Sequence, residues 1–128
     1  MEINELNLAE HEEDTRPIGI FDSGIGGLSV WIEIRRQLPF ESTLYYADQA
    51  HVPYGRKSIV EVREFAFAIT EFLLNQGAKI IVIACNTASA AALKSLRSTF
   101  PAIDFIGMEP AVKPAVEKTL TGHVGIIA

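Results

Sequence analysis

The sequence predicts an α/β fold, an open and mostly parallel sheet with helices on both faces. Short runs of β-branched and aromatic residues alternate along the 128 residues with longer segments whose apolar side chains recur every three or four positions. The segment 80–84 is apolar throughout, which is typical of a strand that is buried on both faces of a parallel sheet. Strands and helices that alternate in this way are joined by right-handed crossovers into one sheet.

The first predicted unit is a strand, a turn and a helix. Residues 17–22 read as a short apolar strand that ends in a carboxylate, Asp22. The turn 23–27 contains three glycines, and the following segment 28–38 has helical apolar spacing. We expect Pro39 to end this helix, because proline lacks the N–H that a helix requires.

The second unit begins with a strand over 43–47, followed by Asp48 and a long loop over 49–57. Ser58 and Glu61 match the capping box of a helix start, in which each side chain accepts a hydrogen bond from the other's backbone N–H. We expect this helix to end at Gly77. Its predicted apolar face consists of Ile59, Val62, Ala66, Ile69 and Leu73.

The third unit places the only cysteine of the chain between a strand and a helix. Cys85 follows the strand 80–84, and an alanine-rich helix is expected over 87–98 with Asn86 or Thr87 as its N-cap. Unpaired N–H groups at a helix start favour negative charge, so Cys85 is a candidate nucleophile or base. Beyond it we expect a strand over 104–107, a short helix that begins at Pro110 and a further strand over 122–128.

The charged residues are unevenly distributed. Residues 1–14 hold six acidic side chains and no Lys or Arg, whereas the remaining residues hold ten acidic and eleven basic side chains. We expect residues 1–16 to form a disordered acidic tail, and the lack of a basic stripe argues against a nucleic-acid partner. The sequence shows no membrane-spanning run and no signal peptide, and its single cysteine precludes an intrachain disulfide, so we expect a cytoplasmic protein.

Side chains capable of chemistry collect where the predicted strands end. Ligands of open parallel sheets bind beyond the carboxyl ends of the strands. The residues expected there are Asp22, Ser23 and Gly24, Asp48 with its loop, Cys85, Asn86 and Thr87, and Met108 with Glu109. Any one of them could cap a helix without further function, but their convergence on one edge together with the sole cysteine predicts a site.

Two other kinds of site are not favoured. The glycine-rich turn lacks the third glycine of a dinucleotide fingerprint, since Ser29 occupies that position. We expect its N–H groups to approach a small carboxylate instead. The three histidines have no metal-ligand spacing, so no metal site is predicted.

Three motifs resemble, in the same order, the N-terminal signatures of glutamate racemases, a branch of the aspartate/glutamate racemase family. They are FDSGIGGLSV at 21–30, VPYG at 52–55 and IACNTA at 83–88. The resemblance implies one half of a two-domain racemase fold. Residues 17–108 would form the first α/β domain with a catalytic Cys85, and residues 109–128 would form the connection and the first strand of an incomplete second domain.

The resemblance also implies a reaction, the cofactor-independent interconversion of L- and D-glutamate that supplies D-glutamate for peptidoglycan and so for cell-wall biogenesis and cell shape. One thiolate removes the Cα proton and a thiol on the opposite face returns one, so neither a cofactor nor a metal is required. Cys85 would be one of these thiols, with Asp22 as a further catalytic residue. The implied substrate-binding residues are Asp22, Ser23, Pro53, Tyr54, Gly55, Asn86 and Thr87.

The chain departs from the family pattern because it holds a single cysteine. The family's second thiol comes from a Cys-Thr-His motif in the other half of the enzyme, and that motif does not occur here. We therefore expect a racemase sequence cut short and inactive alone. The alternatives are a non-catalytic module that binds an acidic amino acid, a racemase of another acidic amino acid, and a homodimer in which Cys85 of each subunit faces a shared pocket.

Overall fold

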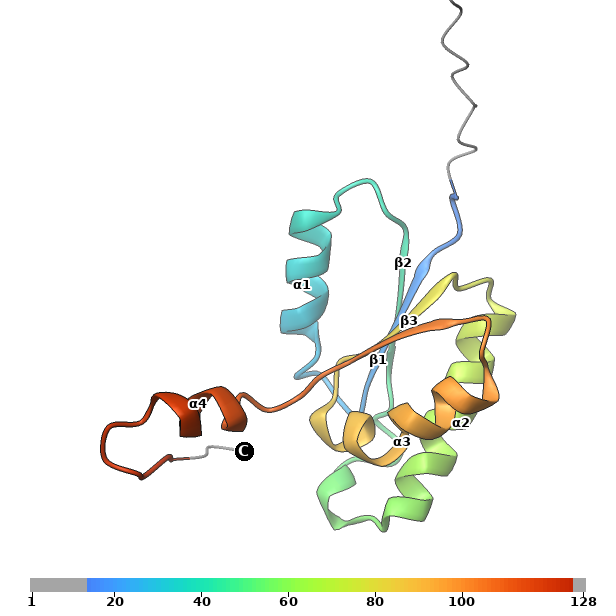
Figure 1. Cartoon of the computed structure of the whole chain (residues 1–128). Helices are drawn as coiled ribbons and strands as arrows, with labels where there is room; N and C mark the ends of the chain where they lie inside the picture. The colour runs from blue at the N-terminus through green and yellow to red at the C-terminus, as the bar shows by residue number, and fades with distance from the viewer. Residues whose placement is uncertain (1–13, 126–128) are drawn as a thin grey trace, which may run out of the picture.

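The computed structural model, which describes residues 14–125, has the predicted α/β fold with strands and helices in alternation (Figure 1). The elements in chain order are β1 (Ile18–Asp22), α1 (Leu28–Gln37), β2 (Thr43–Ala47), the 3₁₀ turn η1 (Tyr54–Arg56), α2 (Ile59–Asn75), β3 (Ile80–Ile83), α3 (Asn86–Thr99), β4 (Asp104–Gly107) and α4 (Val112–Lys118). Figure 1 shows α4 apart from the sheet, at the end of an extended stretch. No helix within residues 14–125 is long and apolar enough to cross a membrane.

All four strands run parallel in the order β2-β1-β3-β4, and Ile18 of β1 pairs with Thr43 on one side and Ile80 on the other. The chain therefore leaves β1 in one direction to form β2 and in the opposite direction to form β3 and β4. With right-handed crossovers, this reversal places α1 on one face of the sheet and both α2 and α3 on the other. Ligands of such sheets bind where the order reverses, which here lies between the carboxyl ends of β1 and β3.

The apolar side chains of the strands separate into two buried clusters, one on each face of the sheet. The cluster on the α1 face consists of Ile18, Ile20, Val82 and Ala84. Trp31 of α1 packs against it, and its indole N–H donates a hydrogen bond to the Thr43 hydroxyl (2.9 Å), which joins α1 to β2. The larger cluster includes Phe21, Ile81 and Ile83 of the strands together with Leu73 of α2 and Leu96 of α3.

The helix α2 begins and ends as its sequence predicts. The Ser58 hydroxyl accepts a hydrogen bond from the Glu61 N–H (3.2 Å), and the Glu61 carboxylate accepts one from the Ser58 N–H (2.8 Å). Gly77 has a φ of +87°, the left-handed conformation that ends many helices. Four of the five predicted core positions are buried, but Ile59, the first residue of α2, is 65% exposed.

Two predictions near the C-terminal side are wrong or fall outside the described part. Pro110 does not begin α4, which starts two residues later at Val112 and holds Pro114 in its first turn, where a missing N–H costs little. The predicted strand over 122–128 has no strand structure at 122–125, and residues 126–128 lie outside the described residues. Most of the predicted acidic tail, residues 1–13, also lies outside them.

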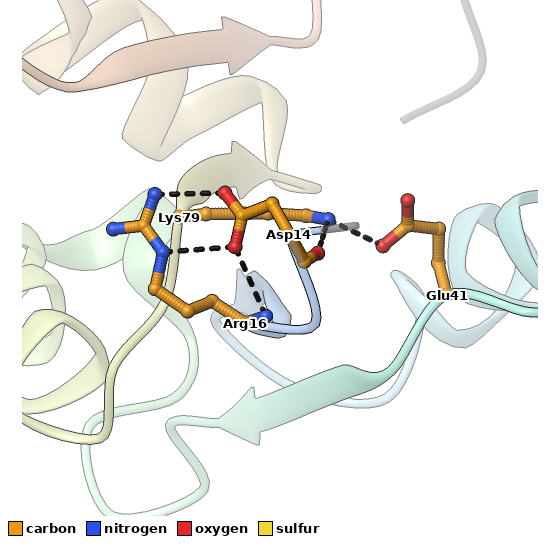
Figure 2. Close-up of polar contacts among 4 residues, drawn as sticks. All are labelled: Asp14, Arg16, Glu41 and Lys79. Carbon is orange, nitrogen blue, oxygen red and sulfur yellow. Dashed lines mark hydrogen bonds and ion pairs between the residues drawn. The ribbon is translucent and has the colours of Figure 1, made fainter. Parts of the chain in front are cut away.

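Charged side chains join the beginnings of three strands at the edge opposite the carboxyl ends (Figure 2). The Lys79 ammonium group, next to β3, lies 2.7 Å from the Glu41 carboxylate before β2 and 2.6 Å from the Asp14 carbonyl oxygen before β1. Arg16 donates two further hydrogen bonds to the Asp14 carboxylate (2.9 and 2.8 Å) and lowers the pKa of that carboxyl to about 2. These contacts hold the beginnings of β1, β2 and β3 together.

The capping box of α2 gives a stability prediction. Replacing Ser58 with alanine removes the acceptor for the Glu61 N–H, so Ser58→Ala should lower the free energy of unfolding by about 1 kcal/mol. Urea denaturation followed by circular dichroism measures this change. Ser98→Ala, which removes an exposed hydroxyl inside α3, is the matched control and should change stability by less than about 0.5 kcal/mol. Equal stability of both variants would contradict the role of the capping box.

Candidate active site

An open pocket of about 640 Å³ lies where the strand order reverses, at the carboxyl ends of β1 and β3. The loop after β1 with the start of α1 forms one wall and Ala84 with the start of α3 forms another, while Val52 and Met108 complete the lining. The pocket brings together five of the site residues predicted from the sequence, namely Asp22, Ser23, Cys85, Asn86 and Thr87. Gly24 and Met108 also line the pocket as expected, whereas Asp48 and Glu109, which were expected at the same edge, are not among its lining residues.

The Asp22 carboxylate is buried and bound by backbone N–H groups of the chain itself. One carboxylate oxygen accepts a hydrogen bond from the Gly27 N–H (2.7 Å), and the other accepts one from the Ser23 N–H (2.7 Å). Gly27 immediately precedes α1, so the carboxylate lies at the positive end of that helix. We expected the N–H groups of the glycine-rich turn to approach a small ligand carboxylate, but at Gly27 the carboxylate belongs to Asp22.

Gly27 is required for space and not for an unusual backbone conformation. Its φ is −65°, which any residue adopts. A Cβ atom at this position would lie 2.7 Å from the Asp22 Cβ, 2.8 Å from the Tyr45 hydroxyl oxygen and 2.9 Å from the Ala84 Cβ. The close packing of the turn against β1, β2 and the residue that follows β3 therefore leaves no room for a side chain at this position.

Cys85 is the N-cap of α3, so the prediction that Asn86 or Thr87 fills this role is wrong. Cys85 has an extended backbone conformation, and its sulfur accepts a hydrogen bond from the Ala88 N–H (3.4 Å). The helix begins at Asn86, one residue earlier than predicted, because the cysteine sulfur replaces the oxygen of a usual capping side chain. The side chains of Asn86 and Thr87 are therefore not needed as caps, and both residues line the pocket.

The cysteine sulfur also connects the two polar segments of the pocket. Its Sγ lies 3.7 Å from the Ser23 hydroxyl, and Cys85 is 7% exposed. Ser23 in turn is hydrogen-bonded through its N–H to Asp22. The arrangement supplies one group that can exchange a proton, a nearby hydroxyl and the free N–H groups at the start of a helix, which are suited to bind an anion.

The predicted substrate-binding residues 53–55 lie beside the pocket and are not among its described lining residues. Tyr54 is buried in the same apolar cluster as Cys85 and Ala88, and its hydroxyl donates a hydrogen bond to the Asp48 carboxylate (2.6 Å). Burial and the Asp48 carboxylate raise the pKa of Tyr54 above its usual range, so the hydroxyl remains a donor. Of this loop, Val52 is the residue that reaches the pocket.

Two contacts that shape the site were not found by sequence reasoning. Ser89 of α3 is buried, and its hydroxyl donates to the Ile83 carbonyl (3.3 Å) and accepts from the Met108 N–H (2.9 Å), which fixes Met108 at the pocket. Asp48 accepts hydrogen bonds from both His51 and Tyr54. A serine within a helix has no sequence signal for such a role, whereas the position of Asp48 after β2 was a signal.

Among the described residues no group of three or more His, Cys, Asp or Glu side chains could hold a metal ion.

The fold and the pocket define a class of protein, a doubly wound α/β domain with a thiol and a carboxylate at its ligand crevice. Comparison with known proteins identifies the family. The sequence is 56% identical over 117 residues to a glutamate racemase of Roseiflexus sp. (strain RS-1), an alignment that covers 91% of this chain and 43% of the relative. No protein-family model matches the chain.

Solved structures give the same result. The glutamate racemase from Thermus thermophilus, in complex with beta-chloro-D-alanine, has a TM-score of 0.71 and 51% identity over 80% of this chain and 38% of its own. The Escherichia coli glutamate racemase, in complex with L-glutamate and the activator UDP-MurNAc-ala, has a TM-score of 0.75 and 41% identity over 84% of this chain and 41% of its own. The chain therefore belongs to the glutamate racemase family and matches the N-terminal half of its members, spanning less than half their length.

The crowding around Gly27 predicts a strongly destabilised variant. Gly27→Ala forces a methyl group against atoms of Asp22, Tyr45 and Ala84, so the free energy of unfolding should fall by roughly 1 to 3 kcal/mol. Urea denaturation tests this expectation. Gly55→Ala is the matched control, because no atom lies within 4 Å of an added Cβ there. A Gly27→Ala variant as stable as Gly55→Ala would show that the turn can relax.

Two tyrosines with a raised pKa, Tyr45 and Tyr54, predict a loss of stability at alkaline pH. The pKa of Tyr45 is raised to about 12 by burial and by the nearby Asp22 and Cys85 side chains, and the pKa of Tyr54 is raised as well. A tyrosine in the unfolded chain ionises near pH 10. The contribution of the two raised pKa values to the free energy of unfolding should therefore be fully present below about pH 10. It should be lost as the pH rises toward the pKa values of the folded state. Urea midpoints between about pH 9 and 12 measure this loss.

The Tyr54→Phe variant separates this effect from the titration of other groups. It should lose less stability over the same pH interval than the unmodified chain, because it lacks one of the two shifted hydroxyls. Ser98→Ala, which removes a hydroxyl that does not ionise in this pH interval, is the control and should follow the unmodified chain. Identical pH dependence of all three proteins would rule out the explanation.

Proposed function

We propose that this chain is the N-terminal part of a glutamate racemase and supplies one of the two thiols that interconvert L- and D-glutamate without a cofactor. The observation that carries the proposal is the position of Cys85, whose sulfur lies at the strand-order reversal beside Ser23 and the buried Asp22. The motifs around these residues and the relatives named glutamate racemase support it. The L-glutamate in the Escherichia coli structure supports the choice of substrate.

Cys85 is suited to exchange a proton with the Cα atom of a bound amino acid. Its sulfur already accepts the Ala88 N–H, so a negative charge on it is stabilised by a donor that does not move during the reaction. The thiolate removes the Cα proton from one face of the substrate, and in the reverse direction the thiol returns it. A second acid must act on the opposite face, and the chain contains no second cysteine to provide it.

The remaining polar residues bind and orient the substrate. The first-turn N–H groups at Asn86 and Thr87 have no acceptor within the helix and suit a substrate carboxylate. Asp22 is engaged by the Gly27 and Ser23 N–H groups, so it acts by holding Ser23 beside the sulfur and by attracting the substrate ammonium group. Tyr54 and its neighbours Pro53 and Gly55 support the wall that Val52 forms.

The biological setting follows from the reaction. D-glutamate produced in this way would enter peptidoglycan and so serve cell-wall biogenesis and cell shape. We place the reaction in the cytoplasm, which is reducing and keeps the thiol of Cys85 unmodified. The single cysteine favours one further candidate function for the chain alone, a module that binds an acidic amino acid without turnover.

Proton NMR of L-glutamate in D₂O tests the reaction. The 128-residue chain alone should form no D-glutamate, because only one face of the substrate meets a thiol. A chimera that joins this chain to the remaining C-terminal part of the Roseiflexus relative should lose the Cα proton signal and form D-glutamate. Cys85→Ser in the chimera should reduce this rate by about a thousandfold, the size of a general acid–base contribution.

The controls separate the candidate functions. His123→Ala, at a residue that does not line the pocket, should leave the rate of the chimera unchanged. A folded chimera that binds glutamate without racemising it would favour the binding module and contradict the racemase. Formation of D-glutamate by the isolated chain would instead indicate a complete site built by two copies. A folded chimera that neither binds nor turns over glutamate but accepts another acidic amino acid would reassign the substrate.

A further inference from the structure

A second polar group, centred on the Asp48 carboxylate, is attached to the strand that carries Asp22 and is not part of the pocket lining. Asp48 follows β2 directly and is 3% exposed. Its carboxylate lies 2.8 and 2.9 Å from the Nδ1 atom of His51 and accepts a hydrogen bond from the Tyr54 hydroxyl at 2.6 Å. Because a carboxylate only accepts, Nδ1 must carry the hydrogen, so both partners are donors. Hydrogen-bond donors offset the cost of burying a carboxylate, and the loss of one donor leaves part of the buried charge without a partner.

The His51 ring contacts the Asp48 carboxylate through its Nδ1 atom and also packs against a second ring through its face. It stacks on the Phe65 ring of α2, with ring centroids 3.9 Å apart and an angle of 15° between the planes. The side chain nevertheless remains 44% exposed, so it is not a core residue. The two contacts attach the loop after β2 both to the end of that strand and to α2.

The loop that His51 and Tyr54 hold contains Val52, which forms part of the pocket wall. Val52 lies between His51 and Tyr54, and its Cγ2 atom would lie 3.7 Å from a Cβ at Gly24, in the loop that follows Asp22. The Asp48 N–H donates to the Asp22 carbonyl (3.0 Å), so the centre of the group is attached to the strand that carries Asp22. Tyr54 packs in the same cluster as Cys85. Both ends of the wall are thus joined to Asp48.

We propose that His51 and Tyr54 are positioning residues that act through Asp48 to hold Val52 against the pocket and so limit access to Cys85. Without the His51 contacts, one end of the wall is released while the other remains fixed by Tyr54. The loop then opens locally, and the sulfur becomes accessible more often. The inference rests on the proposed function only for what the pocket binds, because the geometry of the wall is independent of any reaction.

The rate at which iodoacetamide alkylates Cys85 in the complete 128-residue chain measures this access. His51→Ala should be alkylated about tenfold faster than the unmodified chain, the change expected when a hydrogen bond to a buried charged group is lost. His51→Asn retains a side-chain N–H donor for Asp48 and should restore a rate close to that of the unmodified chain. His123→Ala is the matched control, at an exposed histidine whose Nδ1 atom lies 3.0 Å from the Thr121 carbonyl oxygen, and it should not change the rate.

Urea distinguishes local opening from general destabilisation. If the wall opens locally, the alkylation rate of His51→Ala at low urea concentration is nearly independent of urea, whereas exposure through global unfolding rises steeply with it. An unchanged rate in His51→Ala, or a rate that follows global unfolding, would overturn the proposal. Should His51→Ala fail to fold, Tyr54→Phe decides in the same way: faster urea-independent alkylation supports the proposal and an unchanged rate overturns it. Alkylation needs no turnover, so loss of racemisation in the chimera leaves this result standing.

Discussion

The pairing of the Asp22 carboxylate with the N–H groups of Gly27 and Ser23 is the interaction on which the site depends. It stabilises a buried negative charge at the start of α1 and fixes the angle at which the chain leaves β1. The resulting turn leaves no room for a side chain at Gly27 and brings the Ser23 hydroxyl to 3.7 Å from the Cys85 sulfur. Without this pairing, the pocket would lose both a wall and the neighbour of its thiol.

The parts of the fold that depend on neighbouring residues could be predicted from the sequence. The strands β2 and β4, the capping box at Ser58 and the helix end at Gly77 have the expected positions, because period, capping and turn chemistry are local signals. The placement of Cys85 at the carboxyl end of a central strand was predictable for the same reason, since an unbroken apolar run ends there.

The parts that depend on contacts between distant segments could not be predicted. The need for glycine at position 27 follows from atoms of Tyr45 in β2 and of Ala84 next to β3, and the exposure of Ile59 is not visible in the apolar spacing of α2. The sequence also gives no sign that a sulfur atom can replace a usual N-cap, which is why Asn86 and Thr87 were assigned that role. The link from His51 through Asp48 to β1 requires the strand order itself.

The double role of the Cys85 sulfur has a consequence for chemical probes. A reagent that forms a covalent bond to this atom adds bulk beside the Ala88 N–H and leaves it only the weak acceptor of a thioether, so it blocks the thiol and loosens the first turn of α3 in one step. Amide hydrogen exchange at residues 86–89 would then report labelling without any assay of turnover. Serine at the same position keeps an acceptor for that N–H, so an unreactive form of the protein is available whose helix start is intact.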